Sequence, residues 1–495
     1  MAGDVILAID QGTTNTKALL VGAQAKIVAR ASRPMTLAHP RPGWTEQNAE
    51  HIWASVAAVI EDLVAAAPGH RIAAVAISNQ RETVVAWDAR TGRPVAPAIS
   101  WQCRRSSERC ARLRAEGLEA FVNERSGLGL DPLFPATKLA WLLEAIPEAA
   151  ALATSGDLRV GTIDSWLLWN LTGGKVHATD LSNASRTQLL NLRARDWDPD
   201  LAALFGVPLA ALPRLQDSDS EFGRVAAGVS ALPADIPVRA IMGDSHAALF
   251  GHVQAAPDAV KATIGTGSSI MAATGSLVRS THGLSSTIAW SQGGEAVYAL
   301  EGNITVSGQA AAFATQLLGV ADEQALTDLA TSVETSDGVV FVPALAGLGA
   351  PHWDDRARGL FAGMTLGTRP AHVARATFEA MALQIVDVIE AMQADLAHPL
   401  REIRVDGGAT RNAFLLQLLS DLLRRDVVRQ DSPEASAMGV ARMASQALGA
   451  PMQVGEAPLL RFTPGMADAR RAQIQQSWRT AIARALEHLD PQNTP

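Results

Sequence analysis

The chain has 495 residues, too many for one ordinary hydrophobic core, so we expect two large domains. Apolar residues make up 48% of it and charged residues 19%, and the net charge of −8 without a long basic run argues against nucleic acid as a partner. No apolar run approaches the roughly 18 residues of a membrane span, and the start lacks a basic-then-apolar leader, so we expect no secretory signal. The chain has two cysteines, Cys103 and Cys110, on a segment that we predict to be a helix. Two cysteines are too few for a disulfide framework or a zinc site, which favours a cytoplasmic protein.

The first half alternates strand and helix signals. Residues 5–9 form an unbroken apolar strand, residues 46–67 a helix with its apolar residues on one face, and residues 72–78 a second buried strand. Helices are predicted over 137–143, 163–171 and 247–250. The second half repeats the scheme, with strands predicted over 238–242, 261–264, 269–273 and 403–405 and helices over 370–396, 412–423 and 467–489. The pattern predicts an α/β protein with domains at 1–250 and 251–495, joined by a close hinge because no long Pro/Ser linker separates them.

Two glycine-threonine turns stand half a chain apart. One is Gly12-Thr13-Thr14 after an apolar strand that ends in Asp10, and the other is Gly265-Thr266-Gly267. Neither is a P-loop, because the segment after each turn reads as a strand rather than a helix (18–21 and 27–31 after the first). Glycine permits close approach, and successive N–H groups and hydroxyls can face an anion. Either turn alone is weak evidence, but the pair indicates one phosphate chain held between two halves of the molecule.

Four buried strands end in polar residues, at Asp10, 79–82, 243–244 and 406–408. Ligands bind at such carboxyl edges in open α/β sheets. Asp244 at one of these ends can take the proton of a hydroxyl that attacks a phosphate, although on spacing alone a helix N-cap is the simpler explanation for the residue. We interpret His246 as a structural histidine.

Three further groups have a functional and a structural interpretation. Arg81 and Glu82 can hold polyol hydroxyls, or can form salt bridges with Arg104 or Arg105. Trp101 can offer its face to a sugar, although core packing is the simpler explanation for one of 11 tryptophans. The paired glycines after Asp406, with Asn412, can lie along an adenine and its ribose, or form an ordinary turn.

The order of these motifs along the chain resembles that of the FGGY carbohydrate kinase family, most closely its glycerol kinase branch, and the resemblance covers almost the whole chain. The segments that carry the resemblance are 10–14, 42–44, 78–83, 101–105, 183–187, 243–244, 265–267, 343–353 and 406–408. The run Gly347-Leu348-Gly349-Ala350-Pro351 with Trp353 is especially distinctive. The resemblance implies two ribonuclease-H-like domains of the actin and hexokinase type, with ATP and Mg²⁺ in a cleft that closes.

The resemblance also implies roles for individual residues. Asp244 is the catalytic base, Asp10 lies near Mg²⁺, and Arg81, Glu82 and Trp101 hold the polyol. The nucleotide is held by Thr13, Thr14, Asn15, Lys17, Thr266, Gly308, Gly408 and Asn412.

Several positions depart from the glycerol kinase pattern. Leu133 stands where tyrosine is usual, Ser245 where glutamine is usual, and Ser269 where an aromatic residue is usual, all three in the expected polyol pocket. Lys17 replaces an arginine and Ala312 a glutamine near the nucleotide. A site that loses polar partners can lose orders of magnitude in discrimination.

We therefore predict an ATP-dependent kinase that acts on a terminal hydroxyl of a polyol or small sugar. Glycerol is the nearest named substrate, and a larger polyol or ketose such as erythritol or xylulose is the competing one. An actin-like ATPase without a sugar substrate, and a sugar-sensing regulator, are alternatives from other classes, although the first has no use for Arg81 and Glu82 beside Asp244. A homo-oligomer, either a dimer or a tetramer, is one possible state of assembly.

Overall fold

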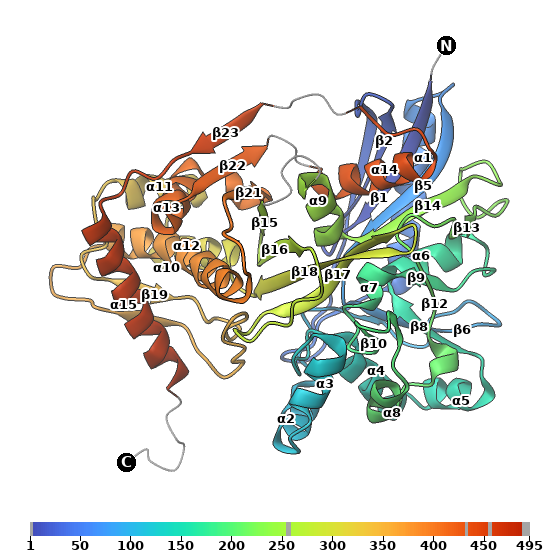
Figure 1. Ribbon diagram of the computed structural model, residues 1–495, viewed down its shortest axis with the longest axis horizontal. Coiled ribbons are helices and arrows are strands. Elements are labelled where there is room, and N and C mark those ends of the chain that lie inside the picture. The colour runs from blue at the N-terminus through green and yellow to red at the C-terminus, as the bar shows by residue number, and fades with distance from the viewer. Residues whose placement is uncertain (1–2, 254–258, 431–433, 454–457, 488–495) are drawn as a thin grey trace.

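The computed structural model describes residues 3–253, 259–430, 434–453 and 458–487. It consists of two α/β lobes, each built around a mixed β-sheet, with the N-terminus on one lobe and the C-terminal helix on the other (Figure 1). The α/β class and the two-domain architecture predicted from the sequence are thereby confirmed.

The first sheet has the strand order β13-β14-β5-β1-β2-β3. Its meander, β1 (Asp4–Gln11), β2 (Asn15–Gly22) and β3 (Ile27–Pro34), is antiparallel, whereas β5 (Arg71–Asn79) and β14 (Pro237–Gly243) run parallel to β1. The unbroken apolar character of β1 follows from its central position, because helices cover both faces of the sheet. The predicted hairpin around Gly12-Thr13-Thr14 is confirmed.

The remaining elements of the first lobe cover this sheet and add a small sheet, β4-β7-β6-β8, with helices beside it. The helices are α1 (Ala49–Ala66), α2 (Ser107–Ala115), α3 (Glu119–Ser126), α4 (Pro135–Ala145), α5 (Pro147–Ser155), α6 (Ile163–Leu171), α7 (Leu181–Ala184) and α8 (Pro199–Phe205), with a 3₁₀ turn at Leu209–Ala211. The short strands are β4 (Glu46–Gln47), β6 (Val84–Asp88), β7 (Ala98–Ile99), β8 (Leu158–Thr162), β9 (Ala178–Asp180), β10 (Leu190–Asn191), β11 (Asp196–Trp197), β12 (Arg214–Gln216) and β13 (Gly223–Arg224).

The second sheet has the order β17-β18-β16-β15-β21-β22-β23. Its strands are β15 (Val260–Ile264), β16 (Ser268–Thr274), β17 (Ser285–Gln292), β18 (Glu295–Ile304), β21 (Glu402–Asp406), β22 (Asp426–Gln430) and β23 (Leu459–Phe462), with a separate pair β19 (Val340–Val342) and β20 (Leu360–Ala362). The helices are α10 (Gly308–Leu318), α11 (Glu323–Thr331), α12 (Pro370–Asp395), α13 (Ala413–Leu423) and α15 (Asp468–Leu486), with a 3₁₀ turn at Gly408–Arg411. The second predicted hairpin, β15–β16 around Thr266, is confirmed.

One face of the second sheet is apolar, and the other, called the polar face below, carries charged and hydroxyl side chains beside buried apolar ones such as Met271 and Ala299. Val260, Ala262 and Ile264 of β15 join the core formed with α10, α12 and α13. Because side chains alternate along a strand, Lys261 and Thr263 point to the opposite face, as do Ser269 on β16 and Glu301 on β18 by their cross-strand register. The polar face is the one that turns toward the first lobe.

Two helices pack against one face of the first sheet. α9 (Asp244–Val253) begins directly at the end of β14, and α14 (Ala435–Ala447) packs against α9 and against β1, β5 and β14 (Figure 1). A helix late in the chain thus returns to the first sheet. The domain division that we predict at residue 250 falls inside α9, and it stays a prediction.

The predicted elements agree with the observed ones apart from their ends. The first predicted helix was placed too early: residues 46–47 form β4, and Asn48 caps α1 by accepting from the His51 amide. Cys103 lies in a turn before α2 rather than in a helix, and both cysteines are free and buried. Residues 488–489 of the last predicted helix lie outside the described residues.

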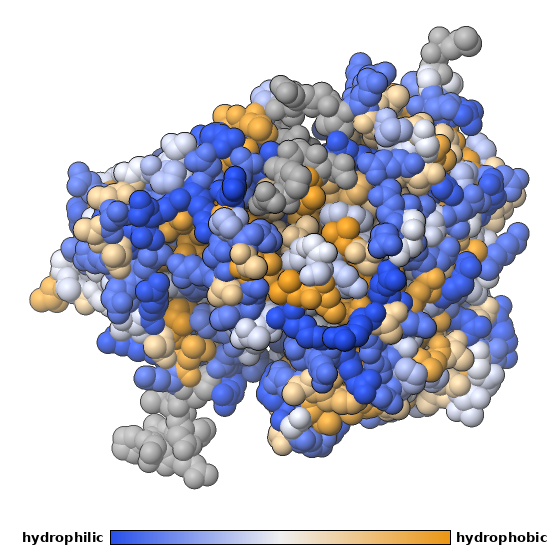
Figure 2. All heavy atoms as spheres, viewed as in Figure 1, coloured by the Kyte–Doolittle hydropathy of each residue, from blue (hydrophilic) through white to orange (hydrophobic). Residues whose placement is uncertain are grey.

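The surface shown in Figure 2 is mostly polar, with apolar side chains scattered among the charged ones. Among the described residues, none of the helices combines the length and the hydropathy that crossing a membrane would need.

Candidate active site

The carboxyl ends of the central strands bring the predicted polar groups together. β1 and β5 pair Asp10 with Ser78, and β14 and β5 pair Gly243 with Asn79. The Ser78 hydroxyl donates to Asp10 at 3.0 Å. In the second sheet, Thr263 pairs with Asp406 and its hydroxyl donates to that carboxylate at 2.6 Å. Of the four strand ends singled out in the sequence, three are therefore neighbours on the first sheet, on β1, β5 and β14, and the fourth, on β21, belongs to the second sheet.

Asp244 stands at the first residue of α9, with 36% of its side-chain surface still exposed. Its Oδ1 lies 3.3 Å from Arg81 Nε. Burial raises the pKa of this carboxyl, and the charge of Arg81 acts in the opposite direction. The position at a helix start and the position beside a buried arginine are compatible, so the capping interpretation and the catalytic one do not compete. An accessible carboxylate at this point can accept a proton.

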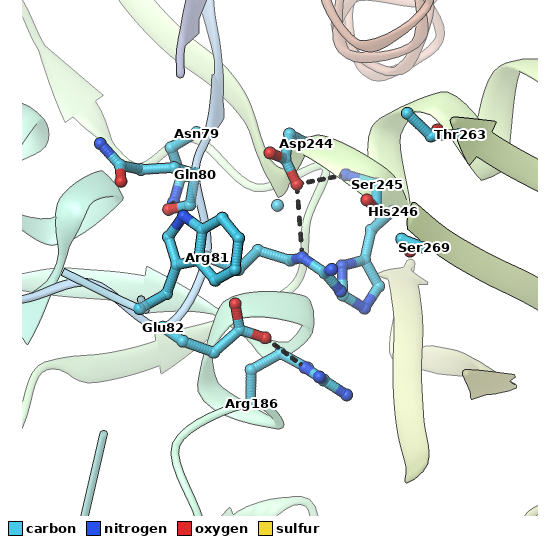
Figure 3. A network of polar contacts seen from close by, with 12 residues as sticks. Asn79, Gln80, Arg81, Glu82, Arg186, Asp244, Ser245, His246, Thr263 and Ser269 are labelled. Atoms are coloured by element: carbon cyan, nitrogen blue, oxygen red, sulfur yellow. Dashed lines mark hydrogen bonds and ion pairs between the residues drawn. The ribbon is translucent and has the colours of Figure 1, made fainter. Parts of the chain in front are cut away.

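Arg81 and Glu82 are both buried, and each has an ionic partner. The two terminal nitrogens of Arg81 donate to Glu301 at 2.9 and 2.7 Å, and Glu82 accepts from Arg186 Nε at 2.7 Å. Figure 3 shows Asp244 on one side of the Arg81 side chain and Glu82 with Arg186 on the other. The suggested salt bridges of these two residues to Arg104 or Arg105 are not formed.

Arg104 and Arg105 instead pair with other carboxylates. Arg104 pairs with Asp131 and Arg105 with Glu46. The structural interpretation of the Arg81-Glu82 pair was therefore wrong about the partners, although right that both side chains are engaged by the protein.

The three substituted pocket positions are each linked to this pair through a neighbouring residue. Ser245 follows Asp244, and Ser269 donates its hydroxyl to Glu301 at 2.7 Å. Leu133 is joined to Glu82 through the buried Lys138, whose ammonium donates to the carbonyls of both residues at 2.6 and 3.1 Å. These contacts connect all three positions to the Arg81-Glu82 pair, and their place in a polyol pocket stays a prediction.

Trp101 connects the expected polyol site to the first turn. Its indole N–H donates to the Thr13 hydroxyl at 2.9 Å, and its backbone N–H donates to Thr83 Oγ1 at 3.2 Å. The side chain is partly exposed, so it is not the core residue of the simpler explanation. Thr13 also lies 3.4 Å from Gln80 Oε1. The two predicted sites are therefore contiguous.

The tip of the first turn is open. Thr14 and Asn15 are exposed there, and the Gly12 amide donates to the Asn15 carbonyl at 2.9 Å. Lys17, on β2, lies 3.2 Å from Glu434, which directly precedes α14. The lysine therefore links the first hairpin to the late segment that returns to the first sheet.

The second turn is joined to the start of α10. The Gly308 amide donates to the Gly265 carbonyl at 2.8 Å, and the Ser307 and Gln309 amides donate to the Thr266 carbonyl at 2.9 and 3.2 Å. A Cβ at Gly308 would stand 2.6 Å from the Gly265 carbonyl oxygen, so only glycine allows this approach. The structure brings Thr266 and Gly308 together, in a turn beside a helix N-terminus, which favours anions.

Gly408 and Asn412 flank the 3₁₀ turn that follows β21. Gly407 has φ +98°, and a Cβ there would stand 2.5 Å from the Ile264 carbonyl oxygen, whereas the space beside Gly408 is open. Asn412 caps α13 by accepting from the Leu415 amide at 3.1 Å, and its amide donates to Thr327 at 2.8 Å. Both ends of the Asn412 amide are therefore bonded to protein groups, which the sequence did not reveal.

Asp10 has the environment of a cation ligand. Burial, followed by the charge of Asp244, raises its pKa to about 7. A divalent cation between two such carboxylates would relieve this unfavourable charge. Among the described residues no cluster of three or more His, Cys, Asp or Glu side chains exists. Mg²⁺ is commonly held by one or two carboxylates together with water and phosphate, so the donor set fits it.

His246 is fully buried, and burial holds its pKa well below the usual value, so it is neutral. Its Nε2 lies 3.4 Å from Thr287 Oγ1. These surroundings agree with a structural role.

Sequence reasoning missed Glu301 and did not assign a role to Arg186. Both side chains are fully buried at the centre of the polar contacts. The available signal for Glu301 was a charged residue directly after the apolar run 298–300 of a strand. Arg186 lay within a segment that carries the family resemblance.

Comparisons with known proteins agree with this geometry. The N-terminal domain model of the FGGY family of carbohydrate kinases matches residues 5–251, and the C-terminal domain model matches residues 260–448. An apulose kinase of Pectobacterium atrosepticum is 44% identical over 487 residues, which is 97% of this chain and 98% of that protein. A glycerol kinase of Chromobacterium violaceum is 42% identical over 501 residues, which is 99% of this chain and all of the relative.

Solved structures show the same architecture. The crystal structure of Plasmodium falciparum glycerol kinase with ADP aligns with a TM-score of 0.89 at 30% identity, over 99% of this chain and 100% of the other. A ligand-bound xylulose kinase of Lactobacillus acidophilus aligns with a TM-score of 0.87 at 22% identity, over 97% of both chains, and supports the fold alone. Since the family models and the relatives span both lobes, the chain belongs to the FGGY family of carbohydrate kinases, ATP-using phosphotransferases with an alcohol group as acceptor.

Proposed function

We propose that this kinase phosphorylates a terminal hydroxyl of a polyhydroxy substrate larger than glycerol, and that a five-carbon ketose such as apulose is the first candidate. The observation that carries the proposal is the wall around Arg81 and Glu82. We assign Leu133, Ser245 and Ser269 to this wall, because each is close in sequence or through a hydrogen bond to Asp244, Glu301 or Lys138, and the glycerol branch carries larger or hydroxyl-bearing side chains at these positions. A three-carbon substrate would leave that volume unfilled, and a longer one would occupy it.

The relatives include kinases for both candidate substrates, apulose and glycerol. The apulose kinase and the glycerol kinases have nearly the same identity to this chain, 44% and 42%. Glycerol is therefore the second candidate, favoured by the presence of Arg81, Glu82 and Trp101. The membership of a carbohydrate kinase family argues against the actin-like ATPase and the sugar-sensing regulator.

The proposed mechanism uses Asp244 as the general base. Its exposed carboxylate would take the proton of the substrate hydroxyl as that oxygen attacks the terminal phosphorus of ATP, and the bond from this phosphorus to the bridging oxygen breaks so that ADP leaves. Arg81, held from behind by Glu301, keeps the Asp244 oxygen in place, and Glu82 accepts from a substrate hydroxyl. The two glycine-threonine turns and Lys17 would hold the phosphates. Mg²⁺, held by Asp10, would neutralise charge on the transferred phosphoryl group.

A substrate panel tests the proposal. Glycerol, erythritol, xylitol, xylulose and apulose are incubated with ATP and Mg²⁺, ADP release is followed, and ³¹P NMR shows whether the phosphate is attached to a CH₂ carbon. We expect a five-carbon ketose to give the highest kcat/KM. A wide margin in favour of glycerol would establish the ordinary glycerol kinase activity instead.

A triple variant tests the pocket wall itself. Leu133→Tyr, Ser245→Gln and Ser269→Phe together restore the side chains usual in the glycerol branch. The ratio of glycerol to ketose activity should rise by at least about tenfold, the scale of one misplaced or regained pocket contact. An unchanged ratio in a folded variant would show that these three positions do not select the substrate.

A further inference from the structure

One buried carboxylate lies at the centre of the site's polar contacts. Glu301 is fully buried on β18. Its Oε1 accepts from Arg81, from Ser269 Oγ at 2.7 Å and from Asn303 Nδ2 at 3.0 Å. Its Oε2 lies 2.9 Å from the Arg81 nitrogen Nη1 and 2.9 Å from the Arg186 nitrogen Nη1. A carboxylate offers about four acceptor positions, so Glu301 has none left for a substrate.

These contacts join the two lobes. Glu301, Ser269 and Asn303 belong to the polar face of the second sheet, whereas Arg81 follows β5 and Arg186 follows α7 in the first lobe. Each arginine then reaches a second carboxylate of the first lobe: Arg81 reaches Asp244 at 3.3 Å, and Arg186 reaches Glu82 at 2.7 Å. Thus Glu301 contacts both arginines that contact the proposed base and the proposed substrate ligand.

We propose that Glu301 is a positioning residue for phosphoryl transfer, which fixes Arg81 and Arg186 and through them the carboxylates of Asp244 and Glu82. The proposal rests on the proposed function, in which Asp244 is the base and Glu82 binds the substrate. Glu301 touches neither the substrate nor the nucleotide in this arrangement. It acts by holding the two guanidinium groups in one geometry while the lobes are together.

The charges explain why a carboxylate is needed. Two guanidinium groups that are nearly excluded from solvent, at most 6% exposed, lie together at this point. Burial opposes the ionisation of Glu301, but Arg186 and Arg81 outweigh it and hold the pKa of Glu301 well below its usual value. Without this negative charge, the arginines would repel each other and would compete for Asp244 and Glu82.

The network also determines what Ser269 can offer to a substrate. A serine hydroxyl has one proton, and Ser269 donates it to Glu301. Only acceptor capacity remains on the Ser269 oxygen. A substrate group that contacts Ser269 must therefore be a donor, which a hydroxyl satisfies and a carbonyl or a carboxylate does not.

Glu301→Gln tests the proposal, because the amide has the same shape but turns an NH₂ group toward groups that are themselves donors. Glu295→Gln, on the exposed start of the same strand, is the matched control. We expect Glu301→Gln to lower kcat by about a hundredfold, the cost of a misplacement near 1 Å, with the Kd for ADP within about twofold of wild type. Glu301→Asp keeps the charge and should recover part of kcat.

Crystal structures of wild type and Glu301→Gln give a readout that does not depend on activity. We expect Arg81 or Arg186 to leave its first-lobe carboxylate in the variant. Unmoved arginines, a kcat within about threefold of wild type, or parallel losses of kcat, ADP affinity and melting temperature would each overturn the positioning role. If wild type phosphorylates no member of the panel, the proposed function fails, and the crystal structures still decide whether Glu301 positions the arginines.

Discussion

Replacement of Asp244 by asparagine tests the proposed base. The amide keeps an oxygen that Arg81 Nε, 3.3 Å away, can still bond, and Arg81 retains both of its hydrogen bonds to Glu301. The geometry of the site should therefore survive, and only the capacity to accept a proton is lost. Because burial raises the pKa of Asp244, its charged form is disfavoured in the folded protein, so we expect the variant to be at least as stable as wild type.

The expected decrease in kcat follows from the role of Asp244 as a general base. A general base contributes about 10²- to 10⁴-fold, so kcat should fall by at least about a hundredfold, which corresponds to about 2.7–5.5 kcal/mol of transition-state stabilisation. Loss of a purely structural capping contact would cost about 1 kcal/mol of stability and would leave turnover of the folded enzyme nearly unchanged.

The assay combines ADP release, calorimetric titration with ADP and thermal unfolding. Asp235→Asn, on the exposed loop before β14, is the matched control, because asparagine tolerates the positive φ of 67° found there. A near-normal kcat in Asp244→Asn would remove Asp244 from the mechanism. Loss of ADP binding or of the melting transition would show that the residue supports the fold instead.

Three other predictions concern protons, nucleotide and metal. As the pH falls, kcat/KM should decline with a midpoint above the ordinary pKa of aspartate, because protonation of Asp244 removes the base. A pH profile that is flat on the acid side would contradict this prediction. So would a residual activity of Asp244→Asn with the same pH profile as wild type. Thr13→Val and Thr266→Val should each raise the KM for ATP about five- to tenfold, the value of about one hydrogen bond, and an effect confined to one of them would argue against a nucleotide shared by both turns. Asp10→Asn should raise the Mg²⁺ concentration for half-maximal rate by at least about tenfold, and an unchanged Mg²⁺ dependence would exclude Asp10 as its ligand.

The fold could be predicted from the sequence because its signals are local. A short stretch of sequence is enough to recognise an apolar strand that ends in Gly or Asp, a hairpin with glycine at the turn, or a long amphipathic helix. The order of these elements recurs in the two halves. The return of α14 to the first sheet could not be predicted, because the packing of a helix on a distant sheet leaves no mark in its own periodicity.

The candidate site was predictable at the strand ends and not between the lobes. Asp10, Arg81 and Asp244 can be found in the sequence because each follows or ends an apolar run at the carboxyl edge of a sheet. The contact of Glu301 with Arg81, by contrast, joins residues 220 positions apart, and only the spatial arrangement reveals it. For the same reason the sequence could not show that the Asn412 amide is already engaged in capping α13.

A competition experiment tests the central claim most directly. Equal concentrations of apulose and glycerol are supplied in one tube with limiting ATP, and the two phosphorylated products are quantified by mass spectrometry, so that their ratio equals the ratio of the kcat/KM values. The substitutions at Leu133, Ser245 and Ser269 predict that the ketose phosphate exceeds glycerol phosphate by at least about tenfold. An excess of glycerol phosphate would contradict the account and would identify the protein as a kinase for the smaller polyol.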